Sequence, residues 1–384
     1  MTYSLRNLVV RKLTTALTAG GMALVVFVYA SVLMLDTGLK QTLVSTGEES
    51  NAIFVRRSAE VEVQSLVERH QAMIIENEPE VMIGPEGSPL VSKELVVLIA
   101  LPKLGATEVS NVVIRGGGPA ALSVRPRVKL TEGRMFRPGS NEIVIGGALA
   151  GRFEGVELGS SLRLAQREWQ IVGRFDTGGS GFDSEIWGDN EQLMQTFRRN
   201  AFSSVVVRLT DPGSFDAFKA RLEADPRLTV EAQREPLFYE EQSRVLSGFI
   251  RILGVALSLM FSVGAIIGAT ITMYAAVASR KMEIGVLGAL GFRRSSILLA
   301  FLAEAMLLGF AGWVMGLGFA SLMMTVKITT LNWTSFSELA FRFVLTPDIV
   351  MRTLVFSLAM GFLGGFLPAL RAANMKVVDA IRSD

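Results

Sequence analysis

Few side chains in this sequence are of the types that perform covalent or metal chemistry. The 384 residues include no cysteine and one histidine, His70. The absence of cysteine excludes disulfides, thiol catalysis and Cys-ligated zinc or iron–sulfur centres, and one histidine argues against a His-rich metal site. His70 stands between Arg69 and Gln71 in a polar, helix-like stretch. This setting favours an exposed or capping histidine over a catalytic base.

Motifs for nucleotide binding and for acid–base catalysis are also missing. No lysine follows a glycine, so the sequence lacks the G-x-x-x-x-G-K-[ST] loop that cradles phosphates. Gly116 to Gly118, after Arg115, have neither the setting nor the spacing for phosphate binding, and we expect a turn there. The adjacent carboxylates Glu240 and Glu241 fit a solvated helix face. The sequence therefore predicts a non-catalytic protein that itself binds no cofactor, metal ion or nucleic acid.

Glu304 is an acid inside a long apolar stretch, about 10 residues beyond Arg294. An ionisable group within a membrane costs several kcal/mol unless it is paired, hydrated or protonated. A proton relay and contact with a cationic substrate are alternatives, but a single acid makes a poor relay. We therefore favour a structural role, in which Glu304 forms hydrogen bonds to a neighbouring helix.

Four stretches of the sequence are long and apolar enough to cross a membrane. Apolar residues make up 50% of the chain and charged residues 19%, and the mean hydropathy is +0.41. A spanning helix needs about 20 apolar residues, and the first stretch is too long for the apolar region of a secretory signal. The predicted fold class is thus an α-helical membrane protein with four transmembrane helices. The predicted spans are residues 13–35, 248–279, 295–326 and 349–370.

The distribution of lysine and arginine predicts which segments face the cytoplasm. Residues 1–12 and 280–294 each carry a net charge of +3, and residues 371–384 carry +1. With these three segments in the cytoplasm, four crossings place residues 36–247 and the short loop 327–348 on the other side.

Residues 36–247 are long enough to form a domain with its own core, between the first and second spans. Its alternating patterns predict an α+β domain of two lobes, of which the β-rich lobe covers about residues 111–202. Within it we expect a strand at 121–130. The glycines at 178–181 predict a solvated hairpin tip, with a substrate or partner contact at Phe182 as the alternative.

Small residues mark where helices could pack closely. Gly264 with Gly268, and Gly312 with Gly316, each match the G-x-x-x-G pattern of packed transmembrane helices. Four spans alone hardly enclose a pathway, which suggests a dimer.

The link between the second and third spans has the pattern of a short amphipathic helix. Met282, Val286 and Leu290 fall on one helical stripe, with Arg280, Lys281 and Glu283 around it. The helix is too short to span the membrane. Its apolar face must lie in the membrane interface or in a groove of another protein, and the physics leaves both open.

Residues 280–291 resemble the R-x-x-E-I-G-x-x-x-A-x-G signature of MacB and FtsX type ABC transporter permeases. The opening segment with Leu5, Arg6 and Asn7, followed by Arg11 and Lys12, resembles their amphipathic N-terminal segment. Further similarity to the family's C-terminal ending and to the MacB-type periplasmic core lies in residues 368–373 with 378–382, and in residues 133–136, 141–146 and 169–173. One departure is Val377 or Val378, where the family often has proline.

The resemblance implies that the link is a coupling helix that docks on an ATPase. The residues concerned are Arg280, Lys281, Met282, Glu283, Gly285, Val286, Gly288, Ala289, Leu290 and Gly291. No nucleotide-binding domain is fused in this sequence, unlike MacB, so a separate ATPase subunit that uses ATP and Mg²⁺ is implied. The further partners implied are a second permease copy or a homologous permease, membrane lipid, a periplasmic adaptor and an outer-membrane channel.

The function that the resemblance implies is mechanotransmission in a bacterial inner membrane. ATP hydrolysis by the partner would drive a conformational change of the periplasmic domain, and so export of a substrate, as in a tripartite efflux complex. The alternative is an FtsX-like regulator that activates a periplasmic cell-wall hydrolase. FtsX-like proteins generally carry a smaller outer domain than the roughly 210 residues here, so transport is favoured.

Overall fold

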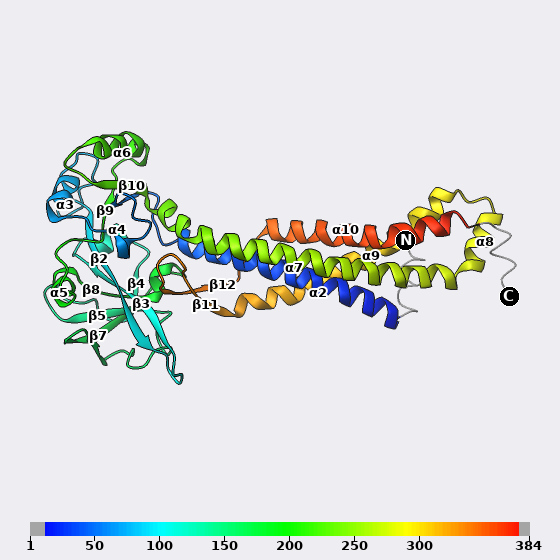
Figure 1. Ribbon diagram of the computed structural model, residues 1–384, viewed down its shortest axis with the longest axis horizontal. Helices are drawn as coiled ribbons and strands as arrows, with labels where there is room; N and C mark the ends of the chain where they lie inside the picture. Colours follow the sequence, from blue (N-terminus) through cyan, green and yellow to red (C-terminus); the bar gives the residue numbers. More distant parts are fainter. Residues whose placement is uncertain (1–11, 376–384) are drawn as a thin grey trace. The chain divides into compact units, whose positions relative to one another are not determined.

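The computed structural model describes residues 12–375 and divides them into two compact units. The membrane unit comprises the described residues up to Thr37, residues 249–326 and those from Phe343 onward. The outer unit comprises residues 38–248 and 327–342. Figure 1 shows the helices and the sheet of these units, coloured along the chain.

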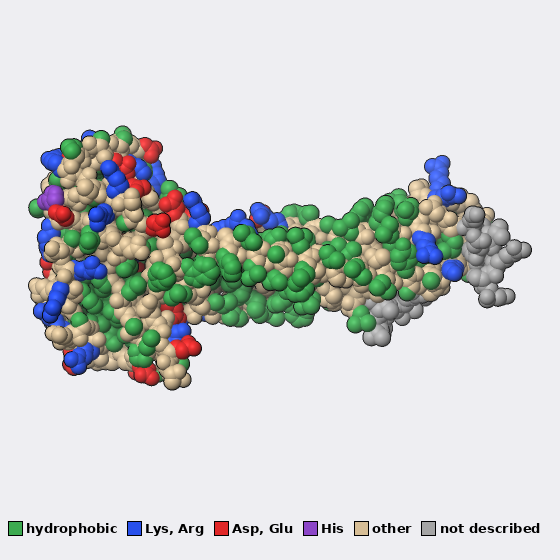
Figure 2. All heavy atoms as spheres, in the orientation of Figure 1, with side chains coloured by type: hydrophobic (Ala, Val, Ile, Leu, Met, Phe, Trp, Pro, Cys, Tyr) green, Lys and Arg blue, Asp and Glu red, His purple; other side chains and the backbone are tan. Residues whose placement is uncertain are grey.

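Four long helices among the described residues are apolar enough to cross a membrane, which confirms the predicted fold class. The helices are α2 (Lys12–Val44), α7 (Glu235–Ser279), α9 (Arg294–Leu322) and α10 (Pro347–Ala373). Three of the predicted spans each lie within one of them, and the predicted span 295–326 extends four residues beyond the end of α9. Hydrophobic side chains cover their surface in Figure 2, as expected for helices that face lipid.

Gly312 and Gly316 are where α9 meets α2. A Cβ atom on Gly312 would lie 2.7 Å from the Cβ of Met22, and one on Gly316 would collide with the carbonyl oxygen of Ala23. Only glycine permits this approach of the two backbones. By contrast, Gly264 and Gly268 on α7 have no such neighbour within 4 Å among the described residues. Their packing against another chain stays a prediction.

Helices α9 and α10 also touch through glycine. A Cβ on Gly309 would lie 2.8 Å from the carbonyl oxygen of Ser357, and one on Gly361 would lie 2.8 Å from that of Ala305. The Ser357 hydroxyl donates a hydrogen bond of 2.7 Å to the carbonyl of Gly309. Such interhelical hydrogen bonds add to close packing where the surroundings are apolar.

The outer unit is built on a mixed sheet of ten strands in the order β10-β1-β9-β2-β3-β8-β5-β7-β4, with β6 also on β7. The strands are β1 (Asn51–Arg56), β2 (Val91–Pro102), β3 (Val109–Gly117), β4 (Lys129–Gly133), β5 (Glu142–Gly146), β6 (Ser161–Leu164), β7 (Arg167–Asp176), β8 (Glu185–Asp189), β9 (Ser204–Arg208) and β10 (Val230–Arg234). The short helices are η1 (Glu62–Gln64), α3 (Arg69–Glu76), α4 (Ala121–Val124), η2 (Gly181–Ser184), α5 (Asn190–Thr196), η3 (Pro212–Ser214) and α6 (Phe215–Ala224).

Strand β2 joins two groups of strands. Its first residues, Val91 to Glu94, pair with β9, and its later residues, Leu95 to Pro102, pair with β3. Strands from residues 111–202 lie on the β3 side of β2, and those from the flanking segments lie on the β9 side. One hydrophobic cluster, with Phe54, Val205 and Trp169 among its members, runs beneath both groups.

Two local expectations for the outer unit were wrong, and the loop between the third and fourth spans has structure of its own. Residues 121–130 do not form one strand, because Ala121 and Val124 are buried on one face of the short helix α4. Gly116 and Gly117 belong to β3 rather than to a turn, because β3 pairs with both β2 and β8. The loop 327–348 contains an antiparallel hairpin, β11 (Lys327–Leu331) and β12 (Glu338–Arg342), which belongs to the outer unit.

We predict that Gly316→Leu destabilises the full chain in detergent by about 1–3 kcal/mol, because the new side chain overlaps α2. Gly318→Leu on the same helix is the matched control, since nothing lies within 4 Å of a Cβ there. Thermal unfolding followed by circular dichroism measures both variants. Equal melting temperatures for the two would contradict the α2–α9 contact.

Candidate functional site

The link between α7 and α9 forms a helix with a defined start and stop. Arg280 precedes the helix α8 (Lys281–Ala289), and Gly291 follows it with a φ of +85°, in the left-handed region that favours glycine. The Gly291 N–H donates to Gly288 and the Phe292 N–H donates to Leu287. This pair of bonds is the Schellman pattern that ends a helix.

One face of α8 is packed and the other is open. Ile284 is buried in a hydrophobic cluster with residues of α9 and α10, together with partly buried Leu287. The stripe of Met282, Val286 and Leu290 is exposed by 61%, 48% and 71%. Lys281, Glu283, Ala289 and Gly291 are also exposed, whereas Gly285 is buried and Gly288 is half-buried.

Arg280 and Glu304 form a buried ion pair within the membrane unit. The two guanidinium nitrogens donate to the two carboxylate oxygens at 2.8 and 3.2 Å. The residues are 9% and 6% exposed, and the Arg280 guanidinium lies 5.9 Å from the ring centre of Phe301. Glu304 is thus hydrogen-bonded to the residue that begins the link, which satisfies the charge that the sequence placed inside an apolar span.

Only the last residue of the predicted N-terminal segment belongs to the residues that the structure describes. Leu5, Arg6, Asn7 and Arg11 lie outside the described residues, and Lys12 begins α2.

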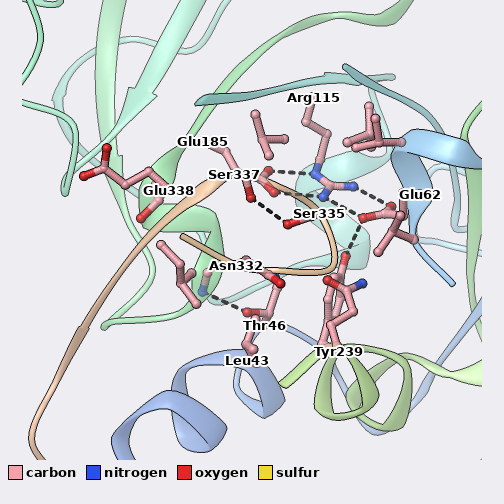
Figure 3. A pocket seen from close by; sticks show the side chains of 18 residues that line it. Leu43, Thr46, Glu62, Arg115, Glu185, Tyr239, Asn332, Ser335, Ser337 and Glu338 are labelled. Atoms are coloured by element: carbon pink, nitrogen blue, oxygen red, sulfur yellow. Dashed lines mark hydrogen bonds and ion pairs between the residues drawn. The ribbon is translucent and has the colours of Figure 1, made fainter. Parts of the chain in front are cut away.

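A second cluster of charges lies in the core of the outer unit, around Arg115 of β3. Its guanidinium donates to Glu62 of η1 at 2.7 and 2.9 Å and to Glu185 of β8 at 2.7 and 2.9 Å. A further bond of 2.6 Å reaches Glu94 of β2. All four residues are buried. Figure 3 shows Arg115 between Glu62 and Glu185, with Tyr239 of α7 donating to Glu62.

Arg125 extends this cluster to the first residue of α7. Its guanidinium binds Glu94 and lies 3.0 Å from Glu235, which is fully buried. The ring of Phe182 faces both arginines, with ring-to-guanidinium distances of 5.0 and 4.6 Å for Arg115 and Arg125. We call Glu62, Glu94, Arg115, Arg125, Glu185 and Glu235 the ion network.

The ion network holds four carboxylates and two guanidinium groups, so its pKa values diverge. Burial raises the pKa of Glu185 and of Glu235 above the ordinary range. Burial also acts on Glu94, but the charges of Arg125 and Arg115 outweigh it and lower the pKa of that carboxyl. The same surroundings therefore raise the pKa of two carboxyl groups and lower that of a third.

The start of α7 is fixed by the ion network. Besides Arg125, the Glu235 carboxylate accepts a hydrogen bond of 3.0 Å from the Glu48 backbone N–H and one of 2.8 Å from the Asn51 amide. A carboxylate in the first turn also interacts favourably with the helix dipole. Displacing this end of α7 would leave buried charges unpaired.

A small cavity of about 50 Å³ adjoins the ion network and the β11–β12 hairpin. Its lining, drawn in Figure 3, includes Arg115, Glu185 and Tyr239 together with Asn332 and Ser337 of the hairpin. It has room for a few water molecules but not for a substrate. Among the described residues no group of three or more Asp, Glu, His or Cys side chains is placed to hold a metal ion.

The loop at 178–181 is solvated only at Gly178 and Gly179, and the segment around these two glycines is covered. Asp183 accepts hydrogen bonds of 2.7 and 2.9 Å from the backbone N–H groups of Thr177 and Gly179. The Gly181 N–H donates to the Thr46 hydroxyl at 2.8 Å, and Phe182 is buried. This segment therefore anchors the end of α2 and the ring that covers the two arginines.

The sequence interpretation missed the ion network. Its members come from six separate segments, and only the sheet brings them together. A usable clue was present: Glu94 and Arg115 each interrupt an apolar strand, and a charge in such a strand needs a buried partner. His70, by contrast, is exposed, beside Glu68 at 3.2 Å.

The fold and these sites define a multi-pass membrane protein with a large α+β domain between its first and second spanning helices. Two family models match the chain: the MacB-like periplasmic core domain over residues 15–225 and the FtsX-like permease C-terminal over residues 255–377. The chain belongs to the MacB- and FtsX-like family of ABC transporter permeases.

Named relatives share low sequence identity with this chain. The macrolide export ATP-binding/permease protein MacB of Hahella chejuensis is 23% identical, over 96% of this chain and 58% of its own length. MacB of Bdellovibrio bacteriovorus is 22% identical over 71% of this chain and 44% of its own length. The uncharacterized ABC transporter permease YvrN of Bacillus subtilis is 33% identical over 29% of this chain and 25% of its own length. The chain thus spans about half the length of the two MacB relatives.

Two of the solved structures similar to the chain are a periplasmic region and an extracellular domain of transporters. The periplasmic region of MacB from Actinobacillus actinomycetemcomitans has a TM-score of 0.36 and 13% identity, over 48% of this chain and 89% of that one. The extracellular domain of YknZ from Gram-positive bacteria has a TM-score of 0.35 and 16% identity, over 47% of this chain and 98% of that one.

We predict that Arg115→Met lowers the free energy of unfolding of the outer unit by about 3–5 kcal/mol, because three buried glutamates lose their partner. Arg134→Met is the matched control. Its ion pair with Glu142 is exposed on the arginine side, so the expected cost is much smaller than for Arg115→Met. Urea unfolding followed by tryptophan fluorescence measures both changes. A similar cost for the two variants would show that the ion network contributes no more than a surface pair.

We predict a stability of the outer unit that falls with rising pH on account of Glu185 and Glu235. In the unfolded chain both titrate near the ordinary glutamate pKa of about 4.3. Their folded-state pKa is raised, so stability declines as the pH rises from that value through the folded-state pKa. Glu185→Gln should flatten the decline, whereas exposed Glu132→Gln should not. Urea unfolding from pH 4 upward tests this, and identical slopes in both variants would contradict it.

Proposed function

We propose that the chain is the permease component that an ABC ATPase drives, with α8 as the coupling helix. The observation that carries the proposal is the exposed apolar stripe of Met282, Val286 and Leu290 on a helix whose other face is packed. A short helix with one packed face presents its free face to a groove in a partner. Membership of the permease family supports an ABC ATPase as that partner.

The mechanism we propose is mechanical. ATP binding and hydrolysis, with Mg²⁺, take place on the ATPase and displace α8. Helix α7 ends directly before Arg280 and begins at Glu235, which the ion network holds. A displacement of α8 therefore reaches the core of the outer unit along one helix. No channel through this chain is required for such a change to drive export of a substrate.

The proposed setting is a bacterial inner membrane, with residues 36–247 in the periplasm. A second copy or a homologous permease, membrane lipid, a periplasmic adaptor and an outer-membrane channel complete the proposed assembly. The two MacB relatives are named as macrolide exporters. For this chain we propose export without defining the cargo.

The alternative function is regulation of a periplasmic cell-wall hydrolase. The match of residues 255–377 to the FtsX-like permease C-terminal is the observation that favours it. The match of residues 15–225 to the MacB-like periplasmic core favours export instead. Full-length chain in lipid nanodiscs, used as bait, distinguishes the two: retention of an adaptor supports export, and retention of a hydrolase supports regulation.

We predict that Glu283→Lys or Gly288→Trp weakens co-purification of the ABC ATPase about tenfold and uncouples ATP hydrolysis from movement of the outer unit. The first change reverses a charge on α8, and the second adds bulk to it; a loss of about 1.4 kcal/mol of binding energy gives this factor. Membrane insertion should survive in both. Leu299→Trp is the control, because Leu299 is an exposed apolar residue of α9, 62% exposed. Wild-type co-purification and coupling in the α8 variants would contradict the docking role.

A further inference from the structure

Helix α9 is connected at both ends to elements that the proposed mechanism uses. About 10 residues after its start at Arg294, Glu304 binds Arg280, the residue directly before α8. Beyond its end, the chain continues through the turn η4 (Met323–Thr325) into the hairpin β11–β12, which belongs to the outer unit. We infer that Arg280, Glu304 and Glu338 are positioning residues of a second force path, in which α9 and the hairpin carry the movement of α8 to the outer unit alongside α7. The inference rests on the proposed function.

The first step of this path is the ion pair of Arg280 and Glu304. Both guanidinium contacts are within hydrogen-bond distance, both residues are buried, and Phe301 covers the guanidinium. Separating two charges inside an apolar helix bundle costs several kcal/mol. Since Arg280 is the residue that precedes α8, a displacement of this end of α8 moves α9 with it.

The second step is α9 itself, which has little freedom to slide against its neighbours. Gly309 and Gly361 bring α9 and α10 into backbone contact, and the Ser357 hydroxyl bonds the Gly309 carbonyl at 2.7 Å. Both chain ends of the hairpin continue into these two helices. A close-packed helix pair moves as one body rather than deforming, so the hairpin follows α9.

The third step is the attachment of the hairpin within the outer unit. Glu338, 6% exposed, forms an ion pair with Arg152 and lies 3.9 Å from Lys103. The Ala340 N–H donates to the Ser184 hydroxyl at 3.1 Å.

Further bonds hold the hairpin tip. The Asn111 amide donates to the Phe336 carbonyl at 3.0 Å, and the Thr334 hydroxyl donates to the Gln242 carbonyl of α7 at 3.2 Å. The hairpin thus carries polar and ionic attachments to the sheet, to η2 and to α7.

The two paths end at the same place in the outer unit. Ser184, which holds the hairpin, directly precedes Glu185 of the ion network. The ion network also holds Glu235, where α7 begins. Figure 3 shows hairpin residues Ser335 and Ser337 beside Arg115 and Glu185, and all four residues line the same cavity. Movement of either α7 or the hairpin therefore acts on one set of buried charges.

The test measures how far ATP displaces the outer unit when the second path is cut. The chain has no cysteine, so two introduced cysteines, at exposed Met73 and Leu299, carry the only spin labels. Full-length chain is reconstituted in nanodiscs with the ABC ATPase that co-purifies with it. Pulsed electron paramagnetic resonance compares label distances without nucleotide and with ATP and vanadate.

Two variants cut the path at different places. Arg280→Gln with Glu304→Gln removes both charges of the buried pair, and Glu338→Gln removes the carboxylate that Arg152 binds at the hairpin. We expect each to reduce the ATP-dependent distance change about twofold while ATPase co-purification stays at the wild-type level, because α7 and the α8 stripe are intact. Arg280→Lys, which keeps the charge, should retain the full change. The controls Arg352→Gln and Glu132→Gln remove exposed ion pairs and should have no effect.

The outcomes separate this inference from the function on which it rests. A full ATP-dependent change in both cut variants overturns the second path and leaves the proposed function standing. Loss of ATPase co-purification in the Arg280→Gln, Glu304→Gln variant also overturns it, because the pair would then serve docking rather than transmission. Wild-type chain that retains no ATPase, or shows no ATP-dependent change, overturns the proposed function and the second path with it.

Discussion

Arg115 and Arg125 lie among four buried glutamates, and this arrangement is stable only while every member keeps its partners. Removing one charge from such a cluster leaves another without compensation in a medium of low polarity, where the cost reaches several kcal/mol. The members come from η1, β2, β3, β8, the residue after α4 and the first residue of α7. The ion network therefore does more than fill the core of the outer unit. The other charged groups stay paired only while the first residue of α7 keeps its position. The ion network therefore links this long helix to a ten-stranded sheet.

Helix α7 has a buried charge at each end. Glu235 is its first residue and Arg280 follows its last, and both are held by partners on other elements. Helix α7 is the least packed of the four membrane helices: 22% of its most apolar stretch is buried, compared with 39% for α9. A helix transmits displacement along its axis whether or not its sides are packed, because its own hydrogen bonds make it stiff. A helix that is attached by charged groups at its two ends and is loosely packed between them suits the transmission of displacement better than a helix packed along its whole length.

The sequence predicted those features that depend on local composition. The length of the apolar stretches located all four spans, and the stripe at Met282, Val286 and Leu290 located α8. Both patterns depend only on residues that are close to one another in the sequence. The ion network could not be predicted in the same way: Glu62 and Arg115 are 53 positions apart, and Arg125 and Glu235 are 110 apart. Nor could the hairpin β11–β12, since its strands have five residues each and its buried partners lie in the outer unit. The glycines at 178–181 were misread because a turn pattern gives no information about whether the turn is covered, and here Phe182 and Asp183 are buried.

Glu304 and the four glutamates of the ion network are each paired to an arginine. These pairs suit a component that works by changing position. Guanidinium–carboxylate pairs are directional and bidentate, so they fix orientation as well as distance. Where glycines bring α9 against α2 and α10, no side chain that could change conformation lies between the backbones. In the proposed mechanism, force applied at α8 therefore meets stiff connections rather than compressible ones, up to the carboxylates Glu185 and Glu235. Burial raises the pKa of both of these groups. In that mechanism, the firmness with which the outer unit holds a transmitted displacement depends on the charge of its core.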